Sequence, residues 1–405
     1  MNLKHLVLAQ AVAALACGGG GPNADSPSSP GLPTPPPATS TPPPPSSPQS
    51  YTWTPLEPKP GELVLRETTT NSIFNLRGEA IRGPLADEKR ILTQLPGVNM
   101  FWFAFSVYFP GATVWGSTEP VRQASLPDDK TGSIACGGGR DCIPSLPNTG
   151  PPRGGLNFTN ANAADASYLR DDDLVVGLFV NGVARAYPHN ILWWHEIAND
   201  DIAGHKVSVT MCPLTGSAVV WGGGDEGYTF GVSGNLFNSN LVMYDHQTQS
   251  LWPQLFMGAV SGQARGKWLT MFPFAEMTWA RWRTLHPDTV VLSDRTGASR
   301  SYSSYPYGDY RVNHGDTFRR TSPEPDGRYP NKNMVFALAD RAGGVARGFV
   351  HSDLQAQGGP SGALLDSFAG RPIVVVWESK SQLVRAFAAE AAAGLLSFVA
   401  EPFAP

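Results

Sequence analysis

Residues Val207–Ser217 read VSVTMCPLTGS, and this stretch is the clearest structural signal in the chain. Apolar and polar side chains alternate through its first half, which is the period of a half-buried β-strand. Pro213 and Gly216 then mark a tight turn. The apolar run Ala218–Trp221 follows, so the chain is predicted to reverse into a second strand. Cys212 therefore stands at a strand end, on backbone that the turn holds in place.

The segments around this hairpin predict more strands than helices. Asn181-Gly182, a strong two-residue hairpin signal, separates the apolar runs Leu174–Val180 and Val183–Tyr187. Amphipathic spacing indicates a helix over Phe274–Leu285, and a shorter helix is expected over Asn190–Asn199. The chain has 43 glycines and 37 prolines, which suits short strands joined by many turns.

The sequence also repeats itself. Gly182–Tyr187 (GVARAY) matches Gly344–Phe349 (GVARGF), and Ile202–Val209 matches Phe368–Val375 in the same order. We therefore predict a mainly β (α+β) fold made of two related β-rich units with pseudo-twofold similarity and a few short helices. In the second copy Glu378 stands where Cys212 stands in the first, so any chemistry is expected in the first unit.

The chain begins with a segment typical of export. Leu6–Ala16 is apolar apart from one glutamine, follows Lys4, and is too short to span a bilayer. Small residues before Cys17 resemble a bacterial lipobox, in which Cys17 carries the lipid. We expect an exported protein of the bacterial cell envelope, anchored to the membrane by this lipid. Cleavage after Ala16 would instead give a secreted or periplasmic soluble protein.

Composition divides the rest of the chain. The formal net charge of −4 gives no electrostatic case for nucleic acid as a partner. The Pro/Ser-rich segment after Cys17 is expected to be a disordered tether. The expected parts are a signal peptide at 1–17, the tether at 18–50, an N-terminal region at 51–165, a first β-rich unit at 166–330 and a second at 331–405.

Four cysteines are present. Cys17 belongs to the export segment, and Cys136 and Cys142 are close enough along a Gly-rich loop to form a disulfide. Cys212 is left unpaired, which in an exported protein calls for an explanation. It is either a buried thiol packed as a small hydrophobe or a functional group.

A series of unusual short motifs resembles one family. The motifs run in order from Asp171 to Thr289: DDDLVVG, ARAYP, WHEI, CPL, TFGVSG, NSNLVMYD, SLWPQ and HPDT. Together they are similar to the domain-of-unknown-function 3179 family, over roughly Arg140 to Pro405. The family has no established activity to carry over. Many members resemble Cys-Pro-Leu-Cys at the turn, which hints at redox chemistry, but Thr215 replaces the second cysteine here.

Cys212, His195 and Glu196 are the candidate catalytic residues. His195 could lower the pKa of a redox thiol, or act as base for a thiol nucleophile with Glu196 as orienting group. Cys212 and His195 could also hold copper or zinc. Asn199 stands where a zincin helix needs its second histidine, so a metalloprotease is excluded. Each of these functions requires the thiol to be partly accessible, with His195 and Glu196 approaching it.

Further polar and aromatic residues are expected to line a ligand pocket in the same cleft. They are Ser233, Asn238, Ser239, Tyr244, Asp245 and Trp252. The alternative function is a non-catalytic surface binding module for a carbohydrate or protein ligand, in which exposed aromatics such as Tyr305 and Tyr310 make the contacts. The two hypotheses differ in whether Cys212 lies in a cleft or in the core.

Overall fold

The structure is a computed structural model of the 405-residue chain. It describes residues 55–122, 133–135, 139–147, 156–222, 227–318, 321, 323–341, 343–391 and 394–404. The expected signal peptide with Cys17, the tether and Cys136 lie outside these ranges. Within them, no helix is long and apolar enough to cross a membrane. The fold is β-rich, with 41% strand and 13% helix, which confirms the predicted class.

The first unit is built on the predicted hairpin. Strands β9 (Leu174–Val180) and β10 (Val183–Pro188) reverse at Asn181 and Gly182, whose positive φ angles of 48° and 83° suit a tight hairpin turn. They form the centre of a five-stranded sheet in the order β17-β9-β10-β18-β8. The outer strands are β17 (Ala275–Thr278), β18 (Val290–Leu292) and β8 (Phe158–Asn160).

An antiparallel meander continues the first unit. Its strands are β11 (Ile197–Ile202), β12 (His205–Cys212) and β13 (Ser217–Gly222), so the predicted strand, turn and strand around Cys212 are confirmed. A neighbouring sheet has the order β16-β15-β14-β7. Its strands are β14 (Phe230–Phe237), β15 (Asn240–Asp245), β16 (Leu251–Pro253) and β7 (Ser133–Ala135), and the short helix η2 (Gln254–Phe256) follows β16.

Two predicted helices are shorter than expected. Helix α5 (His189–His195) ends where Glu196 takes a positive φ of 57°, and Ile197 begins β11. Helix α6 (Trp279–Leu285) begins five residues later than predicted, because Ala275–Thr278 pair with β9 as β17. In both cases a tertiary strand pairing overrides the local helical pattern.

The second unit has the same order of elements. Strands β19 (Met334–Asp340) and β20 (Val345–Val350) form a hairpin, followed by helix α7 (His351–Gly358) and a meander. The meander strands are β21 (Ser361–Phe368), β22 (Arg371–Glu378) and β23 (Leu383–Ala388). This order is what the repeated sequence predicts; the pseudo-twofold axis itself stays a prediction.

The N-terminal region completes the second unit. Strand β5 (Val98–Phe101), helix α3 (Trp102–Tyr108) and β6 (Thr113–Val114) place two strands beside β19 and β20, in the order β5-β19-β20-β6. In the first unit β17, α6 and β18 flank β9 and β10 in the same way, with the same parallel pairing at the last strand. Strand β4 (Gln94–Leu95) extends the meander beside β23. The domain boundaries at 165 and 330 stay predictions.

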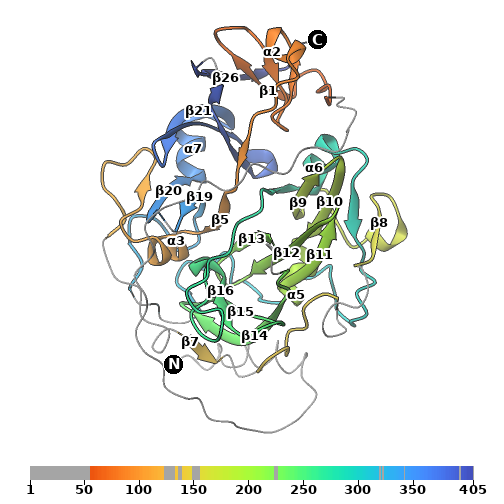
Figure 1. Cartoon of the computed structure of the whole chain (residues 1–405), viewed down its shortest axis with the longest axis vertical. Coiled ribbons are helices and arrows are strands. Elements are labelled where there is room, and N and C mark those ends of the chain that lie inside the picture. Colours follow the sequence, from red (N-terminus) through yellow and green to blue (C-terminus); the bar gives the residue numbers. More distant parts are fainter. Residues whose placement is uncertain are drawn as a thin grey trace.

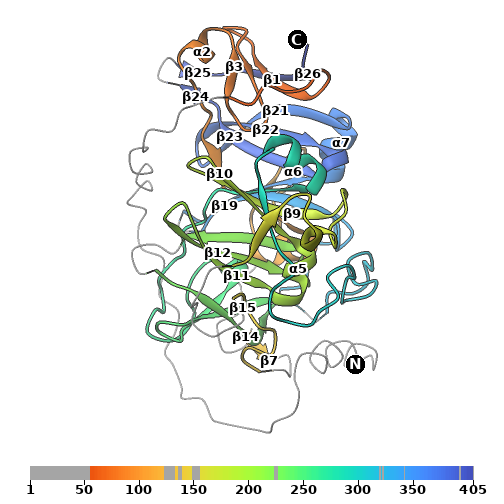
Figure 2. The ribbon, with the colours of Figure 1, turned by 90° about the vertical axis from the view of Figure 1, so that its right-hand side faces the viewer.

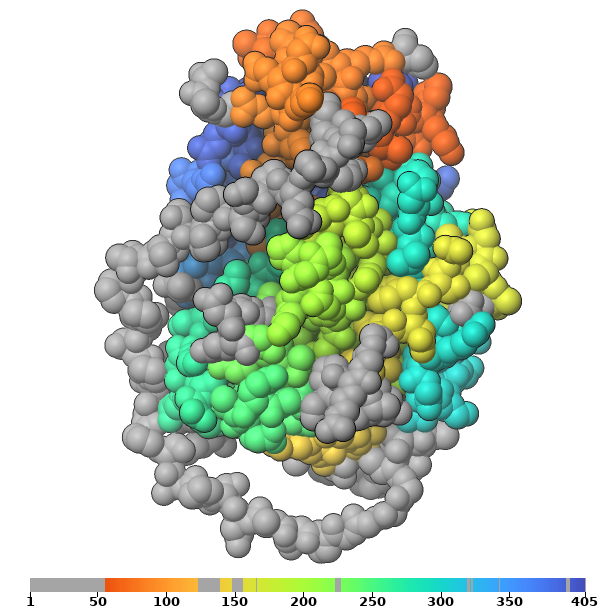
Figure 3. Space-filling model, turned by 45° about the vertical axis from the view of Figure 1, so that its right-hand side comes forward, coloured from red at the N-terminus to blue at the C-terminus, as the bar shows by residue number. Residues whose placement is uncertain are grey.

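The sheets follow one another along the long axis of the molecule (Figure 2). A small sheet of order β26-β1-β2-β3 forms one end, where the C-terminus lies beside the N-terminal strands (Figure 1). In Figure 3 the N-terminal strands of this sheet are orange and lie at the opposite end of the molecule from the green β14–β15 region. The remaining short elements are β1 (Leu63–Glu67), β2 (Ile73–Phe74), β3 (Ala80–Arg82), α2 (Pro84–Asp87), η1 (Ala164–Ala166), η3 (Ser379–Ser381), β24 (Glu390–Ala391), β25 (Gly394–Leu395) and β26 (Phe398–Pro402).

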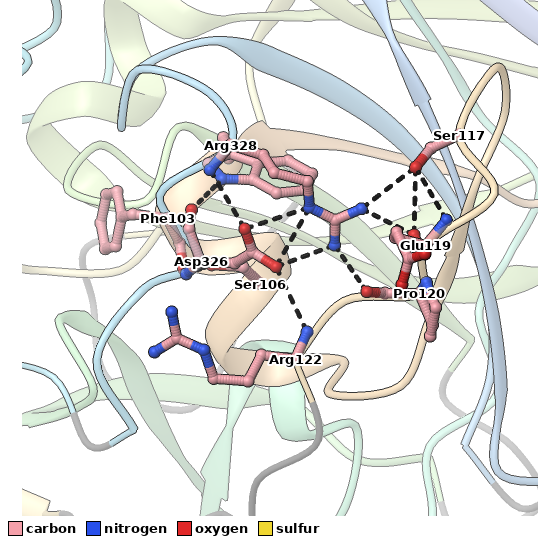
Figure 4. A network of polar contacts seen from close by, with 9 residues as sticks. Phe103, Ser106, Ser117, Glu119, Pro120, Arg122, Asp326 and Arg328 are labelled. Atoms are coloured by element: carbon pink, nitrogen blue, oxygen red, sulfur yellow. Dashed lines mark hydrogen bonds and ion pairs between the residues drawn. The ribbon is translucent and has the colours of Figure 1, made fainter.

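The long connection between β18 and β19 is tied down next to α3. Arg328 donates to the Asp326 carboxylate at 2.8 Å, to Ser117 Oγ at 3.2 Å, and to the carbonyls of Glu119 and Pro120 at 2.6 and 2.7 Å (Figure 4). These charge-assisted bonds hold the polypeptide just before β19. They thereby fix the position of Lys332, four residues farther on.

Candidate functional site

A cavity of about 390 Å³ lies between the two units, at the turn that follows Cys212. The turn is fixed from both sides, because Phe101 N–H donates to Thr215 O at 2.8 Å and Tyr310 OH donates to Leu214 O at 2.7 Å. The residues that line the cavity come from both units and from the β18–β19 connection: Phe101, Arg170, Asp172, Asp173, Leu174, His189, Trp193, Met211, Pro213, Gly216, Glu276, Tyr305, Arg311, Val312, Lys332, Met334 and Gln382.

A buried histidine and glutamate form part of the wall. His189 opens α5 and Glu276 lies on β17, and their side chains are each 4% exposed, with Nε2 and Oε1 3.4 Å apart. Burial lowers the pKa of His189 to about 3, helped by the charge of Arg311, and raises the pKa of Glu276 to about 8. The pair is therefore neutral at neutral pH. Nε2 of His189 and Oε2 of Glu276 have no hydrogen-bond partner within the described ranges.

The second unit places an equivalent pair next to the first. His351 opens α7 as His189 opens α5, and Asn99 lies on β5 as Glu276 lies on β17. His351 Nε2 lies 3.0 Å from Asn99 Oδ1. The Asn99 side chain also hydrogen-bonds toward Glu276, which opposes the rise of that carboxyl's pKa. The second unit thus keeps the histidine but replaces the acid with a neutral amide, so only the first pair titrates as an acid and a base.

Lys332 is a buried cation in the same wall. It is 5% exposed, and its Nζ lies 3.3 Å from the ring centroid of Tyr310 and about 5 Å from those of Phe101 and Phe103. Ring faces attract an ammonium but accept no conventional hydrogen bond. Nζ has no hydrogen-bond partner in the described part of the chain, and burial lowers the pKa of Lys332 to about 7. A buried ammonium without an acceptor lowers the stability of the folded protein unless a bound ligand supplies the missing acceptor.

Arg311 stands at the exposed side of the cavity. Its guanidinium lies over Tyr305 at 4.9 Å and over Trp193 at 5.6 Å, and these two rings meet edge to face with centroids 4.9 Å apart. Tyr305 OH is buried and unpartnered as far as the described residues go. Arg311 therefore rests on two aromatic faces next to several polar atoms that have no partner.

Cys212 does not line this cavity. It is 0% exposed and packs in the core cluster that contains Phe101, Tyr108 and Trp252. Its Sγ accepts the Leu241 N–H at 3.3 Å and lies 3.7 Å from Ser239 O. Burial raises the pKa of the thiol to about 11, and the nearby Glu196 carboxyl adds to this rise. The expectation of a partly accessible thiol is wrong, because the side chain at the strand end turns to the core face of the sheet.

His195 and Glu196 are adjacent in sequence, but their side chains have different neighbours in the structure. Both ring nitrogens of His195 are engaged elsewhere, with Nδ1 2.7 Å from Pro144 O and Nε2 2.7 Å from Tyr302 OH, so neither serves Cys212. Burial lowers the pKa of His195 to about 4. The Glu196 carboxyl is close enough to raise the pKa of the Cys212 thiol, and burial raises the pKa of Glu196 itself to about 8. Within the described ranges no three His, Cys, Asp or Glu side chains gather as metal ligands, so the geometry gives no support to a copper or zinc site.

The predicted pocket residues belong to the β14–β16 sheet and do not line the cavity. The Asp245 carboxylate accepts from Thr248 Oγ1, Ser250 N–H and Trp252 Nε1 and so organises the turn before β16. Tyr244 OH donates to Asp141 at 2.5 Å, and Ser233 Oγ donates to Val242 O across a bulge in the β14–β15 pairing. Asn238 and Ser239 take positive φ angles at the β14–β15 turn. Hydrogen bonds within the sheet and its turns therefore explain Ser233, Tyr244, Asp245 and Trp252. The predicted Cys136–Cys142 pair stays a prediction, because Cys136 lies outside the described residues.

Sequence reasoning missed His189, Glu276, Arg311 and Lys332. A signal for the first two exists in a further repeat: EMTWARWRTLHPDTVV from Glu276 aligns with NMFWFAFSVYFPGATV from Asn99. This alignment pairs Glu276 with Asn99, and the hairpin repeat pairs His189 with His351. Buried polar residues at equivalent positions of two copies are a sign of a shared interface. The spacing of Arg311 and Lys332 within a loop carries no such signal.

Fold and site together define a β-rich protein with a ligand-sized cavity that is lined by residues of several sheets. The comparison with protein families gives a match to the model described as "Protein of unknown function (DUF3179)" over residues 140–400. The chain belongs to this family, which confirms the resemblance of its motifs. No curated protein and no solved structure matches it.

Proposed function

We propose that the protein binds a small ligand in the cavity between its two units. The observation that carries this proposal is a set of buried polar atoms around one cavity that have no hydrogen-bond partner among the described residues: His189 Nε2, Glu276 Oε2, Tyr305 OH and Lys332 Nζ. Buried polar atoms are nearly always paired in native proteins, so several orphans around one cavity favour a missing binding partner. A volume of about 390 Å³ suits a small molecule. This proposal keeps the binding function expected as the alternative and moves it from surface aromatics to an internal cleft.

Blocking the cavity mouth tests this function. Val312 lines the cavity and is 67% exposed, so Val312→Trp adds a large side chain at the mouth without disturbing the core. Val345 is a matched control, because it is 42% exposed and does not line the cavity. We expect compounds that raise the melting temperature of the wild type to keep their effect on Val345→Trp and to lose it on Val312→Trp. Equal effects on both variants would contradict a site in this cavity.

A thiol-centred redox function is the second proposal. Met211, Pro213 and Gly216 line the cavity, so a displacement of this turn would bring Cys212 to it. An ionised thiol would also raise the pKa of Lys332, which places the two groups within electrostatic reach. This function requires an open state that exposes the sulfur. Its test is reaction of the native protein with a thiol reagent, described in the Discussion.

We also propose that the protein is exported and lipid-anchored through Cys17. The support is the apolar segment before the lipobox-like residues. Metabolic labelling with a radioactive fatty acid should mark the wild type and not Cys17→Ser. Labelling of both, or of neither, would contradict the lipid anchor.

A further inference from the structure

Arg311 offers its guanidinium without a protein acceptor. Among the described residues, no carboxylate lies within ion-pair distance of it and none accepts a hydrogen bond from it, while the rings of Trp193 and Tyr305 lie against it. A guanidinium presents a rigid fork of donors that suits the two oxygens of a carboxylate or phosphate. Stacking on two rings limits its motion and leaves that fork open to the cavity mouth.

Lys332 adds a second cation to the same cavity. The carboxylate of Asp316 favours its charged form, but from beyond ion-pair distance. The acidic side chains of the cavity do not balance the two cations. Asp173 accepts from Asn190 Nδ2 at 3.1 Å and from Arg170 N–H at 2.8 Å, and Asp172 lies 3.8 Å from the Arg170 guanidinium. Glu276 is neutral at neutral pH because burial raises its pKa.

We propose that the ligand is a small organic anion, held through an oxyanion group by Arg311 and Lys332. This inference rests on the proposed binding function and names its ligand class. Two cations that have no acceptor among the described residues line one cavity, and the carboxyl groups that line it are paired or neutral. The rest of such a ligand would meet the neutral His189–Glu276 pair, which offers one donor and one acceptor to a hydroxyl, oxo or amide group. A carboxylate and a phosphate share the required chemistry, and the experiment separates them.

A titration with compounds of differing charge tests this class. The full-length protein is titrated with succinate and 2-oxoglutarate as carboxylates, with inorganic phosphate and glycerol 3-phosphate as phosphates, with glucose as a neutral compound and with choline as a cation. We expect at least one carboxylate or phosphate to bind, and the two groups of anions to differ in affinity. Arg311→Gln should weaken that binding by about tenfold or more, since a charge-assisted hydrogen bond to the ligand is lost.

Arg300 provides the matched control. It lies in the same connection, over the ring of Trp194 at 5.9 Å, but does not line the cavity. Arg300→Gln removes the same charge and should leave anion affinity within about twofold of the wild type, since Arg300 does not line the cavity and solvent screens its charge. Equal losses in the two variants would overturn the proposal, because the effect would then be one of general charge.

The outcomes separate the ligand class from the binding function. Binding of glucose or choline that is lost in Val312→Trp, together with no binding of any anion, would overturn the anionic class and leave the cavity function standing. An anion that binds equally well to the wild type and to Val312→Trp would overturn both. Binding of an anion that both Val312→Trp and Arg311→Gln abolish, and that Arg300→Gln retains, would support both.

Discussion

Replacing Lys332 with methionine should stabilise the protein, because the lysine is buried without an acceptor. Burial lowers its pKa from 10.5 to about 7. One pKa unit corresponds to about 1.4 kcal/mol, so the native state disfavours the ammonium by about 5 kcal/mol relative to the unfolded chain. The three aromatic rings around Nζ attract the ammonium and offset part of this cost. We therefore expect Lys332→Met to raise the free energy of unfolding by about 3–5 kcal/mol below neutral pH.

The pH dependence identifies the cause of this gain. Below about pH 7 the lysine is protonated in both states, and the native state bears the full cost. Between about pH 7 and 10.5 the unfolded chain binds a proton that the native protein does not, so the stability of the wild type rises with pH through this term. Above 10.5 the amine is neutral in both states. The advantage of Lys332→Met should therefore shrink steadily from pH 7 and approach zero near pH 10.5.

Urea unfolding at about pH 6 and about pH 9.5, on both proteins, measures this difference. Other groups titrate in the same range, including Glu196, Glu276 and Cys212, but they are common to both proteins and cancel in the comparison. Lys267→Met is the control, because Lys267 is exposed and lies 6.0 Å from the ring of Tyr228. Its effect should stay within about 0.5 kcal/mol at both pH values. A gain for Lys332→Met that is absent, or that is equal at both pH values, would refute the reasoning.

Three further predictions concern the Cys212 turn and the cysteines. Gly216→Ala should destabilise the protein by about 1–3 kcal/mol in urea unfolding. Gly216 has a φ of 61°, and an added Cβ would lie 2.8 Å from the Phe101 ring. An unchanged unfolding midpoint would show that the turn adjusts to the added methyl group without cost. If the native protein keeps Cys212 enclosed as in this structure, the thiol should react with a reagent only as fast as the protein unfolds, since it is fully buried and its pKa is about 11. Rapid labelling of the native protein would instead reveal the open state that the redox proposal requires. Peptide mapping of the oxidised protein should find Cys136 joined to Cys142, and two free thiols would exclude that pairing.

The sequence was sufficient for the parts of the fold that depend on local pattern. The alternation in Val207–Met211, the turn at Pro213 and Gly216 and the Asn181-Gly182 hairpin all formed as expected, because each has one low-energy local conformation. The order of elements also followed from the repeat. The lengths of α5 and α6 did not, because strand pairing at Ile197 and at Ala275 decides where each helix begins or ends.

The candidate site was less accessible to sequence reasoning. A cysteine at a strand end can face either the core or the cavity. The alternating pattern of the strand does not show which face of the sheet packs against the core. Met211 lines the cavity while the adjacent Cys212 packs in the core, so a shift of one residue separates the two outcomes. The cavity itself lies between units that are distant in the chain. Arg311 and Lys332 reach it from a connection whose path depends on contacts such as Asp326 with Arg328.

A crystal structure of the protein with the tightest-binding anion of the titration would locate the ligand. We predict that its oxyanion group lies between the Arg311 guanidinium and the Lys332 ammonium, within hydrogen-bond distance of both, and that its remaining polar atoms face His189 and Glu276. An anion bound at saturating concentration elsewhere on the molecule, with this cavity left to solvent, would contradict the account.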